Sequence, residues 1–204
     1  MIASINHKPY LLNKAVIYFF FSALLIIFTS SVALADKRQR IDGELRKVLL
    51  EAANSSDSFT DRFEAEVWLS DMSGRLQRYM PDDDVRINFL KNVHYEAKRA
   101  KLAPELVLSV IHVESLFNRW AISSVGAQGL MQIMPFWLKE IGRDGDSLFD
   151  VKTNLRFGCT ILRHYLDKEK GNLTRALARY NGSLGRFKYP NKVFDRLQTR
   201  WFKR

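Results

Sequence analysis

Apolar residues recur at helical spacing through most of the chain after residue 60, with almost no strand-like alternation. The segment RFEAEVWLSDMSGRLQRYM, residues 62–80, repeats them until Pro81, and residues 85–102 repeat them again after the sequence PDDD. Proline and acidic residues are favoured in the first turn of a helix, so PDDD predicts where the second of these helices begins.

The same spacing predicts further helices on both sides of this pair. They cover residues 43–53, Pro104 to Asn118, 135–142, Val151 to Glu169, 173–182 and 189–202. A chain of amphipathic helices buries its apolar faces by packing helix on helix around a common core, so the predicted fold class is mainly α.

The N-terminus has the pattern of an export signal. Lys8 and Lys14 precede the apolar run Ala15–Phe28, and small residues then lead to Asp36. The 21 residues from 15 to 35 carry no charge, which is also long enough for an uncleaved membrane anchor. We therefore predict a signal peptide or N-terminal anchor over residues 1–35, and an exported, periplasmic protein whose N-terminus could associate with the membrane.

Charge and cysteine content narrow the class of partner. Removal of residues 1–35 takes two lysines from 32 basic and 22 acidic residues and leaves a formal net charge of +8, which suits an anionic partner. Export makes nucleic acid the least suitable anion, so we expect none. Cys159 is the only cysteine, so no disulfide can form within the chain, and no cluster of His, Cys and acidic residues indicates a metal.

Glu114 lies in the most apolar stretch after the N-terminus, VIHVESLFNRW. At 100° per residue, Glu105, Ser109 and His112 form one polar stripe of the helix, and Glu114 projects from the opposite, apolar face. A buried carboxylate needs a partner or a proton. Two interpretations remain open: Glu114 pairs with Arg119 or caps a neighbouring helix, or it faces a cleft whose apolar walls raise its pKa.

The residues that follow form a recognisable pattern. It consists of Glu114, Ser115, Phe117 and Asn118, then Ala121, Ser123, Gly126, Ala127, Gly129, Leu130, Met131 and Gln132, then Pro135, with Asp150, Asn154 and Gly158, and Tyr180 and Asn181, downstream. This pattern, from about Asn88 to Ser183, resembles the catalytic core of the soluble lytic transglycosylase family. The chain departs from many members at Gly182 and Ser183, where they have Ala-Gly.

The resemblance implies a lysozyme-like helical domain with a substrate cleft, over residues 85–204 including a C-terminal helix, after an N-terminal helical segment, residues 36–84. It implies cleavage of the β-1,4 bond between N-acetylmuramic acid and N-acetylglucosamine in peptidoglycan glycan strands without water, which leaves 1,6-anhydro ends. One carboxyl, that of Glu114, would act as acid and then as base, with no metal or cofactor. We expect a monomer.

The resemblance also implies roles for the residues around Glu114. Ser123 and Gln132 would hold acetamido groups, Met134 would line the cleft, and Gly129 would let the glycan approach the backbone. Tyr180 would donate a hydrogen bond to Glu114, and Asn118 would orient it from one turn away.

Two alternatives from the sequence remain. One is a muramidase similar to goose-type lysozyme, in which a second acid activates water, with Asp144, Asp146 and Asp150 as candidates. The other is a non-catalytic wall-binding protein of a secretion or pilus apparatus.

Overall fold

The computed structural model describes residues 58–59 and 61–202. The predicted signal or anchor and the helix predicted over residues 43–53 lie outside these residues. Across the described residues, helices are joined by turns and loops and no β-strand forms; two isolated bridges join Gln128 to Ile122 and to Ile133. The mainly α prediction is confirmed, and no described helix has the length and apolarity needed to cross a membrane.

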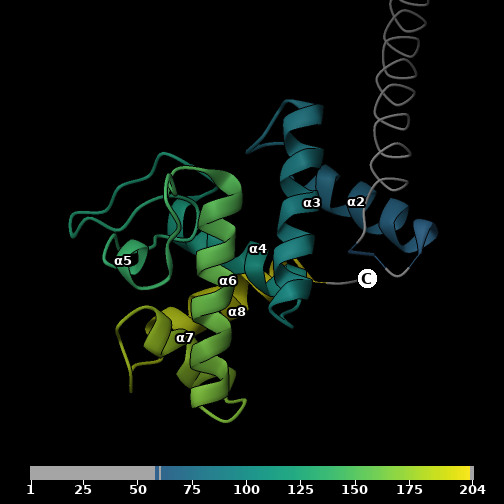
Figure 1. Ribbon diagram of the computed structural model, residues 1–204. Helices are drawn as coiled ribbons and strands as arrows, with labels where there is room; N and C mark the ends of the chain where they lie inside the picture. The colour runs from purple at the N-terminus through teal and green to yellow at the C-terminus, as the bar shows by residue number, and fades with distance from the viewer. Residues whose placement is uncertain (1–57, 60, 203–204) are drawn as a thin grey trace, which may run out of the picture. The chain divides into compact units, whose positions relative to one another are not determined.

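The helices follow the predicted order along the chain (Figure 1). They are α2 (Arg62–Leu76), α3 (Asp83–Arg99), α4 (Pro104–Ser115), α5 (Trp137–Ile141), α6 (Val151–Lys168), α7 (Leu173–Tyr180) and α8 (Lys188–Thr199).

Four of these helices begin at a side-chain cap. Asp61, Asp82, Asp150 and Asn172 each accept a hydrogen bond from the backbone N–H three residues later, which satisfies one of the free donors at a helix start. The predicted start at PDDD is confirmed, with Asp82 as the cap of α3.

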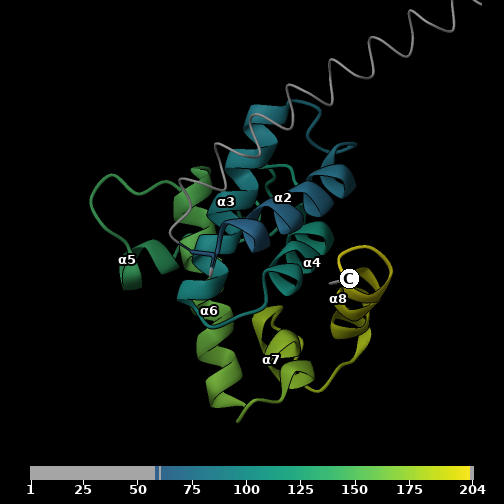
Figure 2. The ribbon, with the colours of Figure 1, turned by 90° about the vertical axis from the view of Figure 1, so that its right-hand side faces the viewer.

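Helix α4 runs through the core and packs against α3 and α8, with α2 beside α3 (Figure 2). The polar stripe of α4 does not lie on the surface, because Glu105, Ser109 and His112 are all buried. Glu105 accepts a 2.9 Å hydrogen bond from Trp68 Nε1 of α2, and Ser109 donates to the Glu105 carbonyl at 2.7 Å. Both faces of α4 are therefore covered, and its polar groups are satisfied inside the protein.

The segment after α8 covers the remaining polar group of α4. Trp201 is fully buried and donates a 3.0 Å hydrogen bond from Nε1 to His112 Nδ1. The hydroxyl of Tyr79 lies 3.1 Å from His112 Nε2. Arg75 of α2 donates to the carbonyls of Arg200 and Phe202 at 2.9 and 3.0 Å. The C-terminal segment thus joins α2 to α4, and α2 shares a core with the helices that follow it.

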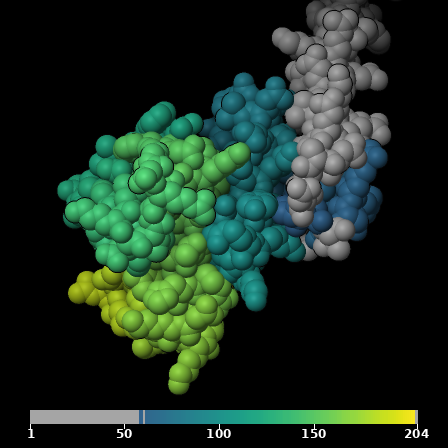
Figure 3. All heavy atoms as spheres, viewed as in Figure 1, coloured from purple at the N-terminus to yellow at the C-terminus, as the bar shows by residue number. Residues whose placement is uncertain are grey.

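Viewed as spheres, the residues from the end of α4 through α6 form one side of the described protein, and α2 and α3 form the other (Figure 3). The yellow-green residues around α7 lie below the residues from α4 to α6 in the same view. Glu114 is carried by the helix on which these groups meet.

Candidate active site

Helix α4 ends immediately after Glu114. Leu116 and Phe117 have φ values of 51° and 67°, in the left-handed region, so the chain leaves the helix at Ser115 rather than at Asn118 as predicted. Asn118 instead accepts a 2.9 Å hydrogen bond from the Trp120 N–H within the following turn. Asn118 therefore does not lie one helical turn from Glu114 on α4, and its orienting role stays a prediction.

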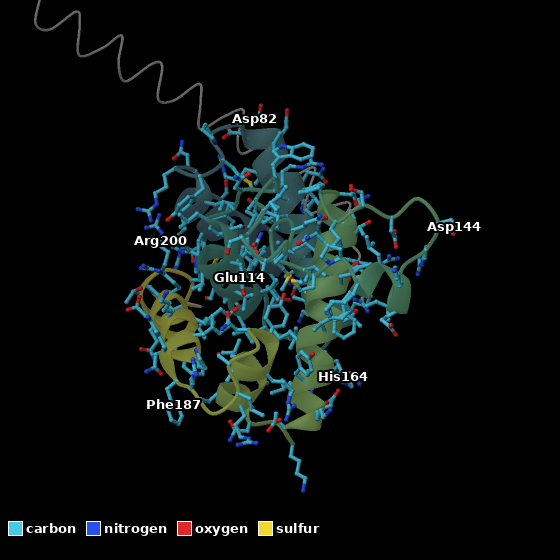
Figure 4. All side chains as sticks on the ribbon, turned by 90° about the vertical axis from the view of Figure 1, so that its left-hand side faces the viewer. Asp82, Glu114, Asp144, His164, Phe187 and Arg200 are labelled. Atoms are coloured by element: carbon cyan, nitrogen blue, oxygen red, sulfur yellow. The ribbon has the colours of Figure 1, made fainter. Side chains whose placement is uncertain are left out.

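Glu114 is half-buried and carries a single hydrogen bond in the described part of the chain. The hydroxyl of Tyr189 donates to its Oε1 at 2.6 Å, and no Lys, Arg or His of the described residues lies within ion-pair distance. Burial raises the pKa of Glu114 from 4.5 to about 7, and the hydrogen bond from Tyr189 opposes part of that increase. The side chain lies at the centre of the protein, between α4 and the α7–α8 pair (Figure 4).

The ion pair between Glu114 and Arg119, part of one of the two interpretations left open, does not form. Arg119 donates from Nε to the Phe149 carbonyl at 3.1 Å, and its guanidinium lies 4.5 Å from the centre of the Trp120 ring. Glu114 keeps its unusual pKa because no cation compensates for its loss of water.

Two tyrosines lie near Glu114, and they have different partners. Tyr180 was the predicted donor, but its hydroxyl donates to the Met131 carbonyl at 2.7 Å, and a hydroxyl has only one proton to give. Tyr189 of α8 takes the predicted place. Burial, and secondarily the charge of Glu114, raises the pKa of both tyrosines well above 10, so both keep their protons.

Asn154 of α6 holds the loop that follows α4. Its Nδ2 donates to the carbonyls of Leu148 and Gln128 at 2.7 and 3.0 Å, and its Oδ1 accepts from the Met131 N–H at 2.8 Å. Gly129 has a φ of 78°, and a Cβ there would overlap Asn154 and the Leu148 carbonyl. Gly129 is needed for packing within the protein, and its expected approach to a glycan stays a prediction.

The same loop is tied to the helices that carry Glu114 and Tyr180. Ser115 Oγ of α4 donates to the Leu130 carbonyl at 2.8 Å, next to the Met131 carbonyl that accepts from Tyr180. Three helices therefore hold the loop at adjacent peptide groups, which fixes its position relative to Glu114.

The remaining predicted site residues lie on this loop. Ser123 Oγ accepts from the Ala127 N–H at 3.0 Å, which leaves its own proton available to another acceptor. Gln132, at a φ of 49°, donates from Nε2 to the carbonyls of Gly129 and Ala121 at 2.9 and 3.2 Å. Met134 is half-buried. The side chains of Ser123 and Gln132 thus shape the loop, and each keeps a polar group that a ligand could contact.

The three candidates for a second acid have other partners or positions. Asp146 forms an ion pair with Arg156, and Asp150 caps α6 through the Thr153 N–H. Asp144 is exposed on a loop well away from Glu114 (Figure 4). Among the described residues, no hydrogen bond joins any of the three to Glu114.

Other reactive groups are not arranged for chemistry. No set of three or more His, Cys, Asp or Glu side chains among residues 58–59 and 61–202 could hold a metal ion. Cys159 is fully buried, and burial raises the pKa of its thiol far above the usual value, which leaves it unreactive. His112 is buried as the neutral ring, with its pKa lowered to about 4 chiefly by that burial.

These features define a mainly α domain with a single candidate acid. That acid, Glu114, is half-buried, has a raised pKa, is held by Tyr189 and lies beside a tightly held loop. The model of the Transglycosylase SLT domain family matches residues 91–200, and the chain belongs to this family. Family membership agrees with the lysozyme-like fold that the sequence motifs implied.

Individual relatives are similar over parts of their length. A transglycosylase of Enterobacteria phage PRD1 is 35% identical over 103 residues, which are 47% of this chain and 38% of the phage protein. Membrane-bound lytic murein transglycosylase C of Actinobacillus pleuropneumoniae serotype 5b is 43% identical over 56 residues, which are 28% of this chain and 14% of the relative. The chain thus spans less than two fifths of each of these two relatives.

Among solved structures, an inactive variant of the lytic transglycosylase Slt from Pseudomonas aeruginosa aligns with a TM-score of 0.45 at 28% identity. The alignment covers 68% of this chain and 25% of that one.

Proposed function

We propose that this protein is a lytic transglycosylase that cleaves the β-1,4 bond between N-acetylmuramic acid and N-acetylglucosamine in peptidoglycan, with Glu114 as its single acid and base. The observation that carries the proposal is the pKa of Glu114, about 7 with no cation beside it. Family membership and the names of the relatives support the same activity.

The chemistry needs one group that can give and then take a proton near neutral pH. Protonated Glu114 gives its proton to the glycosidic oxygen as the bond to C1 breaks. The resulting carboxylate then accepts the proton of the muramyl C6 hydroxyl as that oxygen bonds to C1. The proton count balances without water, and a 1,6-anhydro end results.

The surrounding residues are assigned supporting roles. Tyr189 fixes the Glu114 carboxyl in place and stabilises its ionised form by donating a hydrogen bond. The hydroxyl proton of Ser123, the Gln132 side chain and Met134 are the groups assigned to the substrate's acetamido groups and sugar face. Residues 1–35 are assigned to export or anchoring, 36–84 to the N-terminal helical segment and 85–204 to the catalytic domain.

The mass of the products tests this proposal. Fragments released from purified sacculi should carry 1,6-anhydromuramic ends, about 18 Da lighter than the products of a two-carboxyl hydrolase. Reducing muramic ends as the primary product would establish the muramidase instead. Binding of sacculi without release of fragments would establish the wall-binding protein.

A further inference from the structure

A small pocket is lined in part by Tyr189, the residue that donates to Glu114. It has a volume of about 240 Å³ and lies where the α7–α8 loop meets α8. Its lining residues are Asn181, Ser183, Arg186, Lys188, Tyr189 and Lys192. Three of the six carry a positive charge and none carries a negative one.

These three cations have no acidic partner. Arg186, Lys188 and Lys192 are exposed, and none forms an ion pair or side-chain hydrogen bond with any residue that the structure describes. Lys188 and Lys192 are four residues apart on α8, a spacing at which like charges repel and destabilise a helix. The arrangement costs stability unless an anion compensates for it.

A second basic pocket in the same protein shows the contrast. It lies between α3 and α6, and its lining includes Arg99, Arg163 and Asp167. There Arg163 pairs with Asp167, and Arg99 pairs with Glu96 at 2.5 Å. Within the described part of the chain, two of the three positive charges of that pocket, those of Arg99 and Arg163, have an acidic partner, and only Lys101 has none, whereas none of the three beside Tyr189 has one.

Tyr189 connects the unpaired cations to the proposed reaction centre. Tyr189 lines the pocket, and its hydroxyl donates to Glu114. An anion held by Arg186, Lys188 and Lys192 would therefore lie about one tyrosine side chain from the bond that Glu114 cleaves. At that distance, it belongs to the sugar being cut or to a group attached to it.

We propose that this pocket binds a carboxylate of the stem peptide carried by the muramyl residue, an inference that rests on the proposed function. The protein would then prefer glycan that carries peptide. The N-acetylated sugars of the strand are themselves uncharged. With the lactyl group in amide linkage, the carboxylates of the peptide are the anions attached to the cleaved sugar. Arg186, Lys188 and Lys192 would supply exposed, charge-assisted hydrogen bonds to such a carboxylate.

Binding and cleavage are measured separately so that the two proposals can fail independently. The ligand is a tetrasaccharide of alternating N-acetylglucosamine and N-acetylmuramic acid with its stem peptides, compared with the same molecule after its peptide carboxyls are converted to amides. Affinity is measured with the Glu114→Gln protein, which is expected not to cut either ligand. Cleavage is measured with the unsubstituted protein.

The Glu114→Gln protein should bind the native ligand roughly tenfold more tightly than the amidated one, as three partly exposed ion pairs allow. Adding Arg186→Gln, Lys188→Gln and Lys192→Gln should remove that preference. A control with Arg62→Gln, Lys98→Gln and Lys168→Gln removes one arginine and two lysines that are also exposed, and it should keep the preference. All six side chains are on the surface, so both triple variants should melt near the parent temperature.

Equal affinity for the two ligands, or a preference that survives the pocket substitutions, would overturn the peptide site. A ligand stripped of peptide by an amidase exposes a lactyl carboxylate, and equally tight binding of that ligand would assign the pocket to the lactyl group instead. If the unsubstituted protein does not cleave either ligand but the Glu114→Gln protein still prefers the native one, the transglycosylase proposal is refuted and the peptide site is not.

Discussion

The Tyr189 hydroxyl lies 2.6 Å from Glu114 Oε1, although 75 positions separate the two residues in the chain. A hydrogen bond donated to a carboxylate favours its ionised form, so Tyr189 moderates the increase in the Glu114 pKa that burial causes. Burial and the opposing hydrogen bond from Tyr189 together set that pKa at about 7.

Replacing Tyr189 should shift the pH dependence of activity. In Tyr189→Phe, the ionised form of Glu114 loses its donor, so the pKa of Glu114 rises and the alkaline limb of kcat/KM moves to higher pH. Hydrogen bonds to charged groups contribute about 1.5 to 3 kcal/mol, which corresponds to a displacement of at least about one pH unit.

The matched control is Tyr180→Phe, which removes a hydroxyl that donates to the Met131 carbonyl instead. Its alkaline limb should stay in place. A limb that moves in Tyr180→Phe but not in Tyr189→Phe would contradict the assignment of Tyr189.

Replacing Glu114 should separate catalysis from stability. Glu114→Gln should lower the rate of sacculus lysis by at least about 100-fold, since it removes the proposed acid and base. The folded state of the unsubstituted protein binds the extra proton between pH 4.5 and about 7, so Glu114 becomes more destabilising as pH rises through that window. The variant should therefore gain stability relative to the parent over the same window.

Thermal unfolding of both proteins from pH 4.5 to 8 measures this difference. A variant that melts several degrees lower at pH 8 and still releases glycan would make Glu114 a structural residue.

His112 should have the opposite effect on stability. Its pKa is lowered from 6.5 to about 4 in the folded state, so the unfolded chain binds more protons between these values. Stability should fall as pH drops from 6.5 towards 4, and His112→Asn, which keeps an acceptor for Trp201 but does not titrate, should reduce that slope. The nearby charges of Arg78, Arg196, Arg200 and Asp195 remain in both proteins.

Urea unfolding midpoints at intervals between pH 4 and 7 give the two slopes. Parallel curves for the parent and His112→Asn would show that His112 does not titrate on unfolding.

Removing the Asn154 side chain should loosen the loop beside Glu114. Asn154→Ala removes the two hydrogen bonds that Asn154 donates to the Leu148 and Gln128 carbonyls and the one that it accepts from the Met131 N–H, and should cost about 3 kcal/mol or more of unfolding free energy. Asn118→Ala is the control, because it removes one exposed hydrogen bond and should cost under about 1 kcal/mol. Similar losses in the two variants would mean that Asn154 does not hold the loop.

The sequence predicted the helices well because each depends on local features. Proline, acidic residues and caps such as Asp82 act within one turn, so the starts of α3 and α6 could be predicted to within a residue or two. The end of α4 could not, because Leu116 and Phe117 adopt left-handed φ values that these residue types do not favour.

The sequence predicted the candidate acid, Glu114, but missed the residue that donates a hydrogen bond to it. Glu114 is conspicuous as a carboxylate on an apolar helix face, and the family motif marks it independently. Tyr189 was not singled out, because nothing in a tyrosine near a helix start specifies a partner 75 residues away. The burial of His112 was missed for the same reason, since it depends on Trp201.

The hydrogen bond between Trp201 and His112 spans 89 positions of the chain. Contacts of such sequence separation form late, since both partners must exist before they can meet. A nascent chain that has emerged only as far as α7 already contains Glu114, yet the helix that carries it lacks the indole that covers His112. The core around α4 can therefore close completely only when the chain through Trp201 is present.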